Sequence, residues 1–137
     1  MVFPDVNVWL ALTIEHVHEA AALNWWRTEK DTIAFCRFTQ IGLLRLLTTA
    51  AATDGKPFTM KKAWEAYDTL ASDERTEFVP EPPVLDHSFR ALSASAHISP
   101  KLWADAYLIA FASEYRALVV TFDRPLARRS HNCLLLD

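Results

Sequence analysis

The sequence predicts an α/β fold in which a central, mostly parallel sheet of about four or five strands is surrounded by helices. Short apolar runs recur at Met1–Val6, Thr32–Cys36 and Ala117–Phe122, and runs of this length are typical of strands buried on both faces of a parallel sheet. Longer segments with helical spacing lie between them, as in βαβ units. Because the chain has 137 residues, 51% of them hydrophobic, we expect one domain over residues 1–137 with a single core.

The first half of the chain begins with the strand at Met1–Val6. A short helix is expected at Val8–Thr13, and a longer one from about His16 to Lys30. After the strand at Thr32–Cys36, the leucine-rich segment Phe38–Ala52 has the spacing of a helix with little polar surface. The glycine and proline of Asp54–Pro57 then predict a turn.

The second half begins with a helix over Thr59–Ala71, for which Thr59 is the expected N-cap. A short strand at Glu77–Val79 and a helix at Val84–Ser95 follow. Ser99-Pro100 predicts the start of the next helix, with serine as N-cap and proline at the first helical position. Its expected apolar face is Trp103, Ala104, Tyr107, Leu108, Phe111, Ala112 and Tyr115. The strand at Ala117–Phe122 and a last one at Asn132–Leu136 complete the prediction.

Composition excludes several classes of site. Two glycines are too few for a glycine-rich phosphate loop or a dinucleotide fingerprint. The net charge of −3 means that a nucleic-acid substrate would need a local basic patch. Cys36 and Cys133 lack zinc spacing and are expected to be reduced thiols. Since no apolar run has transmembrane length, we expect a cytoplasmic protein.

Three aspartates carry most of the functional signal. Asp5 and Asp123 end predicted strands, and ligands bind at the carboxyl ends of strands in open α/β sheets. Asp105 lies in an almost wholly apolar helical segment, where an ionised carboxylate is rare unless it is paired or bound to metal. Clustered carboxylates repel one another, and a hard divalent cation relieves that repulsion. The pattern favours a metal-dependent enzyme acting on phosphate, although Asp5 and Asp123 could each instead be a helix N-cap.

Four segments together resemble a known family, the PIN domains, and in particular the VapC-type ribonuclease toxins of toxin–antitoxin pairs. The order, spacing and total length of these segments make the resemblance specific, and it spans essentially the whole chain. The segments are Pro4–Val8, Thr39–Thr48, Ala104–Ala110 and Val120–Arg124.

The resemblance implies a PIN fold, Mg²⁺- or Mn²⁺-dependent endoribonuclease activity, a small antitoxin partner and a homodimer. Asp5, Asp105 and Asp123 match the family's metal-binding acids. Most PIN domains carry a further acid on the helix after the second strand, but residues 36–53 contain no carboxylate. The matching positions are Gln40 and Gly42. Gln40 could offer a neutral carbonyl oxygen or could be an ordinary polar residue, and the loss of an acid implies weaker metal binding.

Other polar residues near these motifs have two interpretations. Asn7 could orient Asp5 or bind a metal-bound water, and it could equally be a residue that begins a helix. Thr121 could hydrogen-bond Asp123 or could simply be a strand residue. The basic cluster could hold an RNA backbone, or it could be a charged solvent face. Its members are Arg124, Arg128 and Arg129.

Two rival functions remain at this stage. In a haloacid-dehalogenase-type phosphatase Asp5 would be a covalent nucleophile, but that class wants an aspartate at position 7, where this chain has Asn7. In a degenerate PIN domain the chain would bind RNA or its partner without catalysis. The missing fourth acid favours that second alternative.

Overall fold

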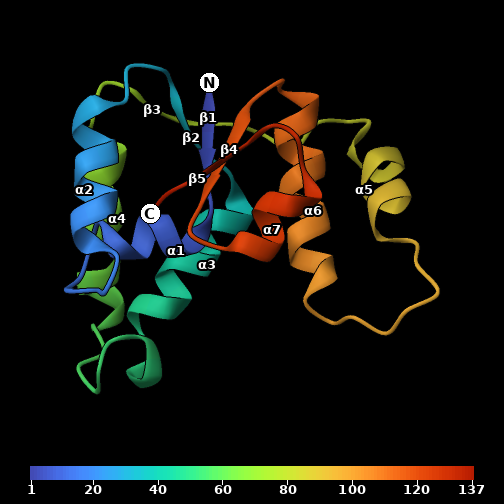
Figure 1. Cartoon of the computed structure of the whole chain (residues 1–137). Helices are drawn as coiled ribbons and strands as arrows, with labels where there is room; N and C mark the ends of the chain where they lie inside the picture. Colours follow the sequence, from blue (N-terminus) through green and yellow to red (C-terminus); the bar gives the residue numbers. More distant parts are fainter.

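The computed structural model describes all 137 residues, Met1–Asp137, and is built around one sheet (Figure 1). Five strands pair in the order β3-β2-β1-β4-β5, and every pair is parallel. This confirms the predicted α/β class. The strands are β1 Val2–Pro4, β2 Ile33–Phe35, β3 Thr76–Phe78, β4 Leu118–Thr121 and β5 Cys133–Leu135.

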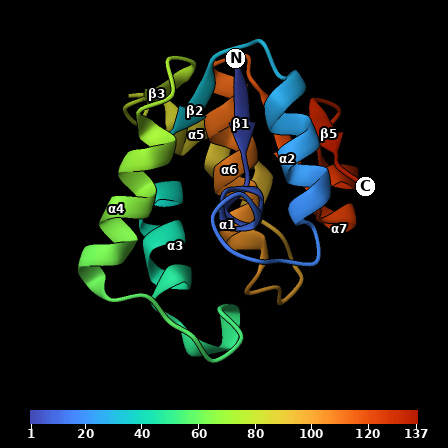
Figure 2. The same cartoon turned by 90° about the vertical axis from the view of Figure 1, so that its left-hand side faces the viewer.

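Helices cover both faces of the sheet. Figure 1 shows α2 and α4 on one side and α5, α6 and α7 on the other, and Figure 2 shows β1 between α4 and α2 with α6 behind it. No helix is long and apolar enough to cross a membrane. The helices are α1 Val6–Ala11, α2 Glu19–Thr28, α3 Arg37–Leu47, α4 Met60–Ala71, α5 Leu85–Ser93, α6 Leu102–Glu114 and α7 Arg124–Arg129, with a 3₁₀ turn at Ala50–Ala52.

Alternation along the strands divides the core into two layers. Val2, Ile33 and Val120 point into the layer beneath α1 to α4. Their neighbours, such as Phe3 and Val119, point into the layer beneath α5, α6 and α7. The apolar runs of the sequence are therefore strands buried on both faces, as predicted.

The α1–α3 contact is unusually close at one point. A Cβ built on Gly42 would lie 2.7 Å from Cγ2 of Val6. Real Cβ atoms do not approach other atoms so closely, so glycine at position 42 lets α3 pack directly against α1. This contact matters for the site, because Val6 follows Asp5 in the chain.

The predicted helix over Phe38–Ala52 is too long. Helix α3 ends at Leu47, and a separate 3₁₀ turn follows at Ala50–Ala52. The hydroxyl of Thr48 donates to the carbonyl oxygen of Leu44 at 3.0 Å, and that of Thr49 donates to the carbonyl of Arg45 at 2.6 Å. Threonine hydroxyls that bond to backbone carbonyls compete with helical hydrogen bonding, which explains the early end.

Two details predicted for α6 are also wrong. Its N-cap is Lys101 rather than Ser99, because Ser99–Lys101 form a turn in which the Ser99 carbonyl accepts from the Leu102 N–H at 3.0 Å. The expected apolar face included Trp103, yet 60% of Trp103 is exposed while Ile109 is buried. Apolar residues surround this helix almost completely, so periodicity could not identify the buried face. The predicted N-cap of α4 is confirmed, since the Thr59 hydroxyl accepts from the Lys62 N–H at 3.1 Å.

Candidate active site

A groove of about 530 Å³ lies beyond the carboxyl ends of β1 and β4, between α3 and the first turns of α6. All three predicted aspartates line it, together with residues from α1, α3 and α6. This is where ligands bind in open α/β sheets. The lining side chains include Asp5, Asn7, Phe38, Ile41, Arg45, Lys101, Ala104, Asp105 and Asp123.

Asp5 follows β1 and occupies the N-cap position of α1. Its side chain makes no capping hydrogen bond. Instead, the hydroxyl of Thr121 donates to Oδ2 of Asp5 at 3.0 Å. Burial raises the pKa of Asp5, and the nearby charges of Asp123 and Asp105 raise it further, while the Thr121 hydrogen bond opposes them. The carboxylate is thus aimed at the groove rather than used to cap the helix.

Thr121 joins two of the acids. It is fully buried at the end of β4, and its hydroxyl oxygen accepts a hydrogen bond from the backbone N–H of Asp123 at 3.0 Å while donating to Asp5. One hydroxyl therefore fixes the end of β1 relative to the turn after β4. The sequence suggested a bond to Asp123 only; the bond to Asp5 depends on strand order, which the sequence did not give.

The two carboxylate oxygens of Asp123 have different surroundings. Oδ1 accepts a hydrogen bond from the backbone N–H of Leu126 at 3.0 Å and so caps α7. The capping interpretation of Asp123 is therefore correct as far as this oxygen is concerned. The residue also lines the groove, where the second oxygen can face a cation.

Asp105 lies on the opposite wall, in the first turn of α6. Burial raises its pKa, Asp123 raises it further, and Arg129 and Lys101 act in the opposite direction. Nε of Arg129 lies 3.7 Å from Oδ2 of Asp105. The pKa values of Asp5 and Asp105 are raised for the same main reason: burial disfavours the ionised form of each carboxylate, and the neighbouring Asp123 adds to this effect.

The groove offers hard oxygen donors but no closed set of ligands. No group of three or more His, Cys, Asp or Glu side chains is placed so that it could hold a metal ion directly. A divalent cation such as Mg²⁺ commonly retains several waters and binds only one or two carboxylates. The residues fit a partly hydrated hard cation better than a fully coordinated one.

Gln40 is not in the groove. It is 5% exposed, its amide oxygen accepts from the guanidinium of Arg37, and it also lies beside the Tyr67 hydroxyl. Asn7 does line the groove and is exposed. Gly42 faces the groove as well, so the α3 wall presents no carboxylate at either position that matches the family's fourth acid.

The predicted basic cluster on α7 is divided among three environments. Arg129 pairs with Asp105, and Nη2 of Arg124 lies 3.7 Å from Oδ1 of the last residue, Asp137. Arg128 is exposed and makes no ion pair. Two cations that the sequence interpretation missed, Arg45 and Lys101, line the groove itself. Arg45 lies three residues after Gly42, so it could have been found once the groove-facing side of α3 was known.

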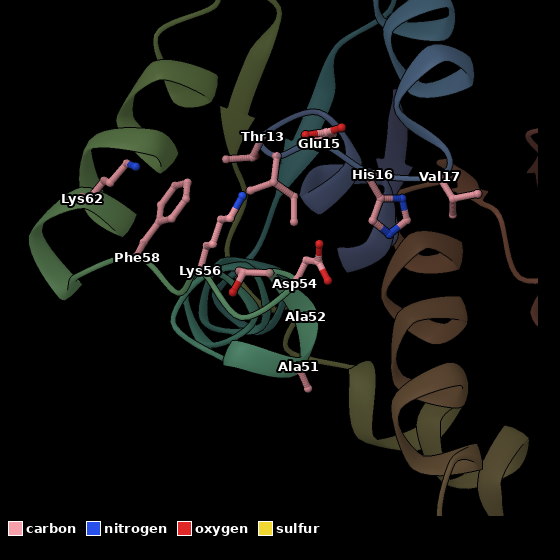
Figure 3. A pocket seen from close by; sticks show the side chains of 12 residues that line it. Thr13, Glu15, His16, Val17, Ala51, Ala52, Asp54, Lys56, Phe58 and Lys62 are labelled. Carbon is pink, nitrogen blue, oxygen red and sulfur yellow. The ribbon is translucent and has the colours of Figure 1, made fainter.

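A second hollow is larger than the groove, at about 800 Å³. Figure 3 shows it between the α1–α2 loop, which carries Glu15 and His16, and the segment before α4, which carries Asp54 and Lys56. It contains none of the three aspartates, and its charges are of mixed sign. Size alone therefore does not single out a candidate site, because all three predicted aspartates line the smaller groove.

Comparison with known proteins identifies the family of the chain. The model of the PIN domain family matches residues 2–132. The chain is 40% identical over 130 residues to Ribonuclease VapC41 of Mycobacterium tuberculosis, covering 90% of this chain and 89% of that protein. It is 28% identical over 124 residues to Ribonuclease VapC29 of the same species, covering 90% and 86%.

Solved structures share the fold at low sequence identity. The crystal structure of VapBC2 from Rickettsia felis, bound to a promoter DNA fragment, aligns over 100% of both chains with a TM-score of 0.72 and 16% identity. The crystal structure of Mycobacterium tuberculosis VapC20 aligns over 93% of this chain and 94% of that one, with a TM-score of 0.71 and 14% identity. The chain therefore belongs to the PIN domain family and is related within it to the VapC ribonucleases.

Proposed function

We propose that this protein is a metal-dependent endoribonuclease that hydrolyses RNA phosphodiester bonds as the toxin of a type II toxin–antitoxin pair. The observation that carries the proposal is the groove that gathers Asp5, Asp105 and Asp123 in a PIN chain. The 40% identity to a protein named as a VapC ribonuclease gives the same reaction class. A phosphatase with Asp5 as nucleophile gains no support, since no aspartate stands at position 7.

In this mechanism Asp5, Asp105 and Asp123 would hold the cation, Mg²⁺ or Mn²⁺, partly through its water molecules, because the three carboxylates are not placed to bind one ion together directly. When bound, such an ion lowers the pKa of water and stabilises charge on a phosphate. The protein's own contribution is orientation. Thr121 holds the Asp5 carboxylate in place, and capping of α7 fixes Asp123. Asn7 is available to hydrogen-bond a water at the mouth of the groove, so Asn7 and Thr121 are supporting residues.

Metal affinity is expected to be modest. The α3 wall faces the groove with Phe38, Ile41, Gly42 and Arg45 rather than with an acid. Affinity for a hard cation depends on the charge and number of its ligands. The enzyme should need more Mg²⁺ than relatives with four acids, and Mn²⁺ should serve it at lower concentration.

The groove also suits a small antitoxin partner. Its walls are apolar at Phe38, Ile41 and Leu108, and its floor is acidic. A partner segment with apolar side chains and one arginine would complement both features, and the arginine would take the place of the cation. Two structural neighbours are described as a toxin–antitoxin complex from Klebsiella pneumoniae and as VapBC2.

A homodimer is the proposed assembly, in the cytoplasm where RNA is available. Helix α4 exposes 73% of Met60 and 46% of Trp64, and exposed apolar side chains that lie together usually mark an interface. Sedimentation at micromolar concentration, with and without the proposed antitoxin partner, tests both the homodimer and the toxin–antitoxin complex. A monomer that gains no mass would contradict them.

The catalytic proposal is tested with purified protein and single-stranded RNA in Mg²⁺. Asp5→Asn should abolish cleavage, whereas Asp68→Asn, at an exposed position on α4, should leave it unchanged. Both changes remove one negative charge, so the pair separates a site effect from a global one. Cleavage by Asp5→Asn at the rate of the parent protein would refute the proposal. If the parent protein itself cleaves no RNA at any Mg²⁺ or Mn²⁺ concentration, the alternative of a PIN domain that only binds is favoured.

A further inference from the structure

Two cations face the acidic groove from opposite walls. Arg45 lies in the last turn of α3, and Lys101 occupies the N-cap position of α6. Both side chains are exposed, and both line the groove that contains the three aspartates. The groove therefore holds Asp5 and Asp123 at its floor and Asp105 on the α6 wall, with Arg45 on one wall and Lys101 on the other.

Neither cation is used by the fold. The side chain of Arg45 makes no hydrogen bond and no ion pair; only its backbone carbonyl accepts, from Thr48 and Thr49. Lys101 is near enough to Asp105 to affect its pKa, yet forms no ion pair with it. Arg124 and Arg129 differ, because each already contacts a carboxylate.

The place of Arg45 is fixed relative to Asp5. Gly42 packs against Val6, and a Cβ there would lie 2.7 Å from the Val6 side chain. Three residues of helix, about 4.5 Å, separate Gly42 from Arg45, and Val6 directly follows Asp5. The contact between α1 and α3 therefore sets the distance between the part of α3 that carries Arg45 and the Asp5 carboxylate.

We propose that Arg45 and Lys101 bind the RNA backbone phosphates on either side of the phosphate that is cleaved, so that the strand crosses the groove from α3 to α6. A guanidinium can hold a phosphate through two hydrogen bonds, and an ammonium acts as a point charge. Such contacts position a nucleic acid without reading its sequence. The inference rests on the proposed ribonuclease function and names the residues that orient its substrate.

Direct RNA binding tests the inference without cleavage. The Asp5→Asn protein, in EDTA, is titrated against a fluorescent single-stranded RNA of mixed sequence over a series of salt concentrations. Adding Arg45→Ala should weaken binding about tenfold or more at low salt, as expected for the loss of one charge-assisted contact. The slope of log K against log salt should fall in magnitude by about 0.7, the value for one phosphate contact on a single strand.

Matched variants show whether the position or only the charge matters. Lys101→Ala should behave as Arg45→Ala does, and Arg45→Lys should restore the salt slope but only part of the affinity. Arg27→Ala is the control, because Arg27 is exposed on α2, makes no ion pair and lies outside the groove. Circular dichroism and thermal melting of each variant show that it is folded.

The results separate this inference from the proposed function. If Arg45→Ala and Lys101→Ala bind RNA as Arg27→Ala does, or if the Asp5→Asn protein binds no RNA, the inference is wrong even when the parent protein cleaves RNA. If the parent binds RNA through Arg45 and Lys101 but never cleaves it, the ribonuclease proposal fails while the phosphate contacts stand.

Discussion

Adding a side chain at Gly42 should destabilise the protein through its contact with Val6. The alanine Cβ would lie 2.7 Å from Cγ2 and 3.2 Å from Cγ1 of Val6, and Val6 is half-buried at the start of α1. Overpacking of this kind typically costs about 1–3 kcal/mol, while replacing a helical glycine with alanine gains about 1 kcal/mol in helix propensity. The expected net loss is about 1 kcal/mol.

A double-mutant cycle isolates this contact. The free energy of unfolding is measured in urea for Gly42→Ala, Val6→Ala and the combination of both. Removing the two Val6 methyl groups should relieve the clash, so the double variant should be more stable than the sum of the single changes predicts, by about 1 kcal/mol or more. Additivity within about 0.5 kcal/mol would refute the reasoning.

The cycle also bears on the missing fourth acid. Glutamate at position 42 would face the groove, but its Cβ would clash with Val6. We therefore expect Gly42→Glu to restore metal affinity only when Val6→Ala accompanies it. Gln40→Glu should have no such effect, because that side chain points toward Arg37 and Tyr67. Metal affinity is read from the rise in melting temperature with Mg²⁺.

Two further predictions concern charge and stability. Burial raises the pKa of Asp5 in the folded protein, so ionisation of Asp5 destabilises the fold above the unfolded pKa, and this penalty disappears as pH falls and Asp5 becomes protonated. In EDTA, Asp5→Asn should therefore raise the melting temperature at pH 7 but not at acidic pH, and Asp68→Asn is the control. Equal melting temperatures of Asp5→Asn and the parent protein at pH 7 would contradict this. The second concerns Arg75, which pairs with Asp73 at 2.8 Å and donates to the backbone carbonyls of Trp26 and Glu29 at 2.7 and 2.9 Å. Arg75→Ala should lower the free energy of unfolding by about 2 kcal/mol, measured in urea. Arg90→Ala is the control, since its pair with Asp86 is exposed. Equal effects of the two changes would show that the partly buried contacts of Arg75 with the carbonyls contribute little.

The positions of β1, β2 and β4 were predictable because these strands are buried on both faces. Val2–Pro4 and Leu118–Thr121 coincide with short apolar runs, and a run of that length is typical of a buried strand. Strand order was not predictable. The bond from Thr121 to Asp5 joins residues 116 positions apart, and no local pattern contains such a contact.

The faces of α3 and α6 were the least predictable features, and both border the site. Helix α6 carries apolar residues on all sides, so its burial is decided by which side α5 and the sheet cover. On α3 the sequence offered Gln40 and Gly42 as equivalent candidates for the position of the missing acid. They lie two residues apart and so point in different directions on a helix. The choice is made by Val6, whose close packing requires glycine at the groove-facing position. The residue that excludes an acid from this wall therefore lies beside Asp5, and the same packing brings Arg45 to the groove.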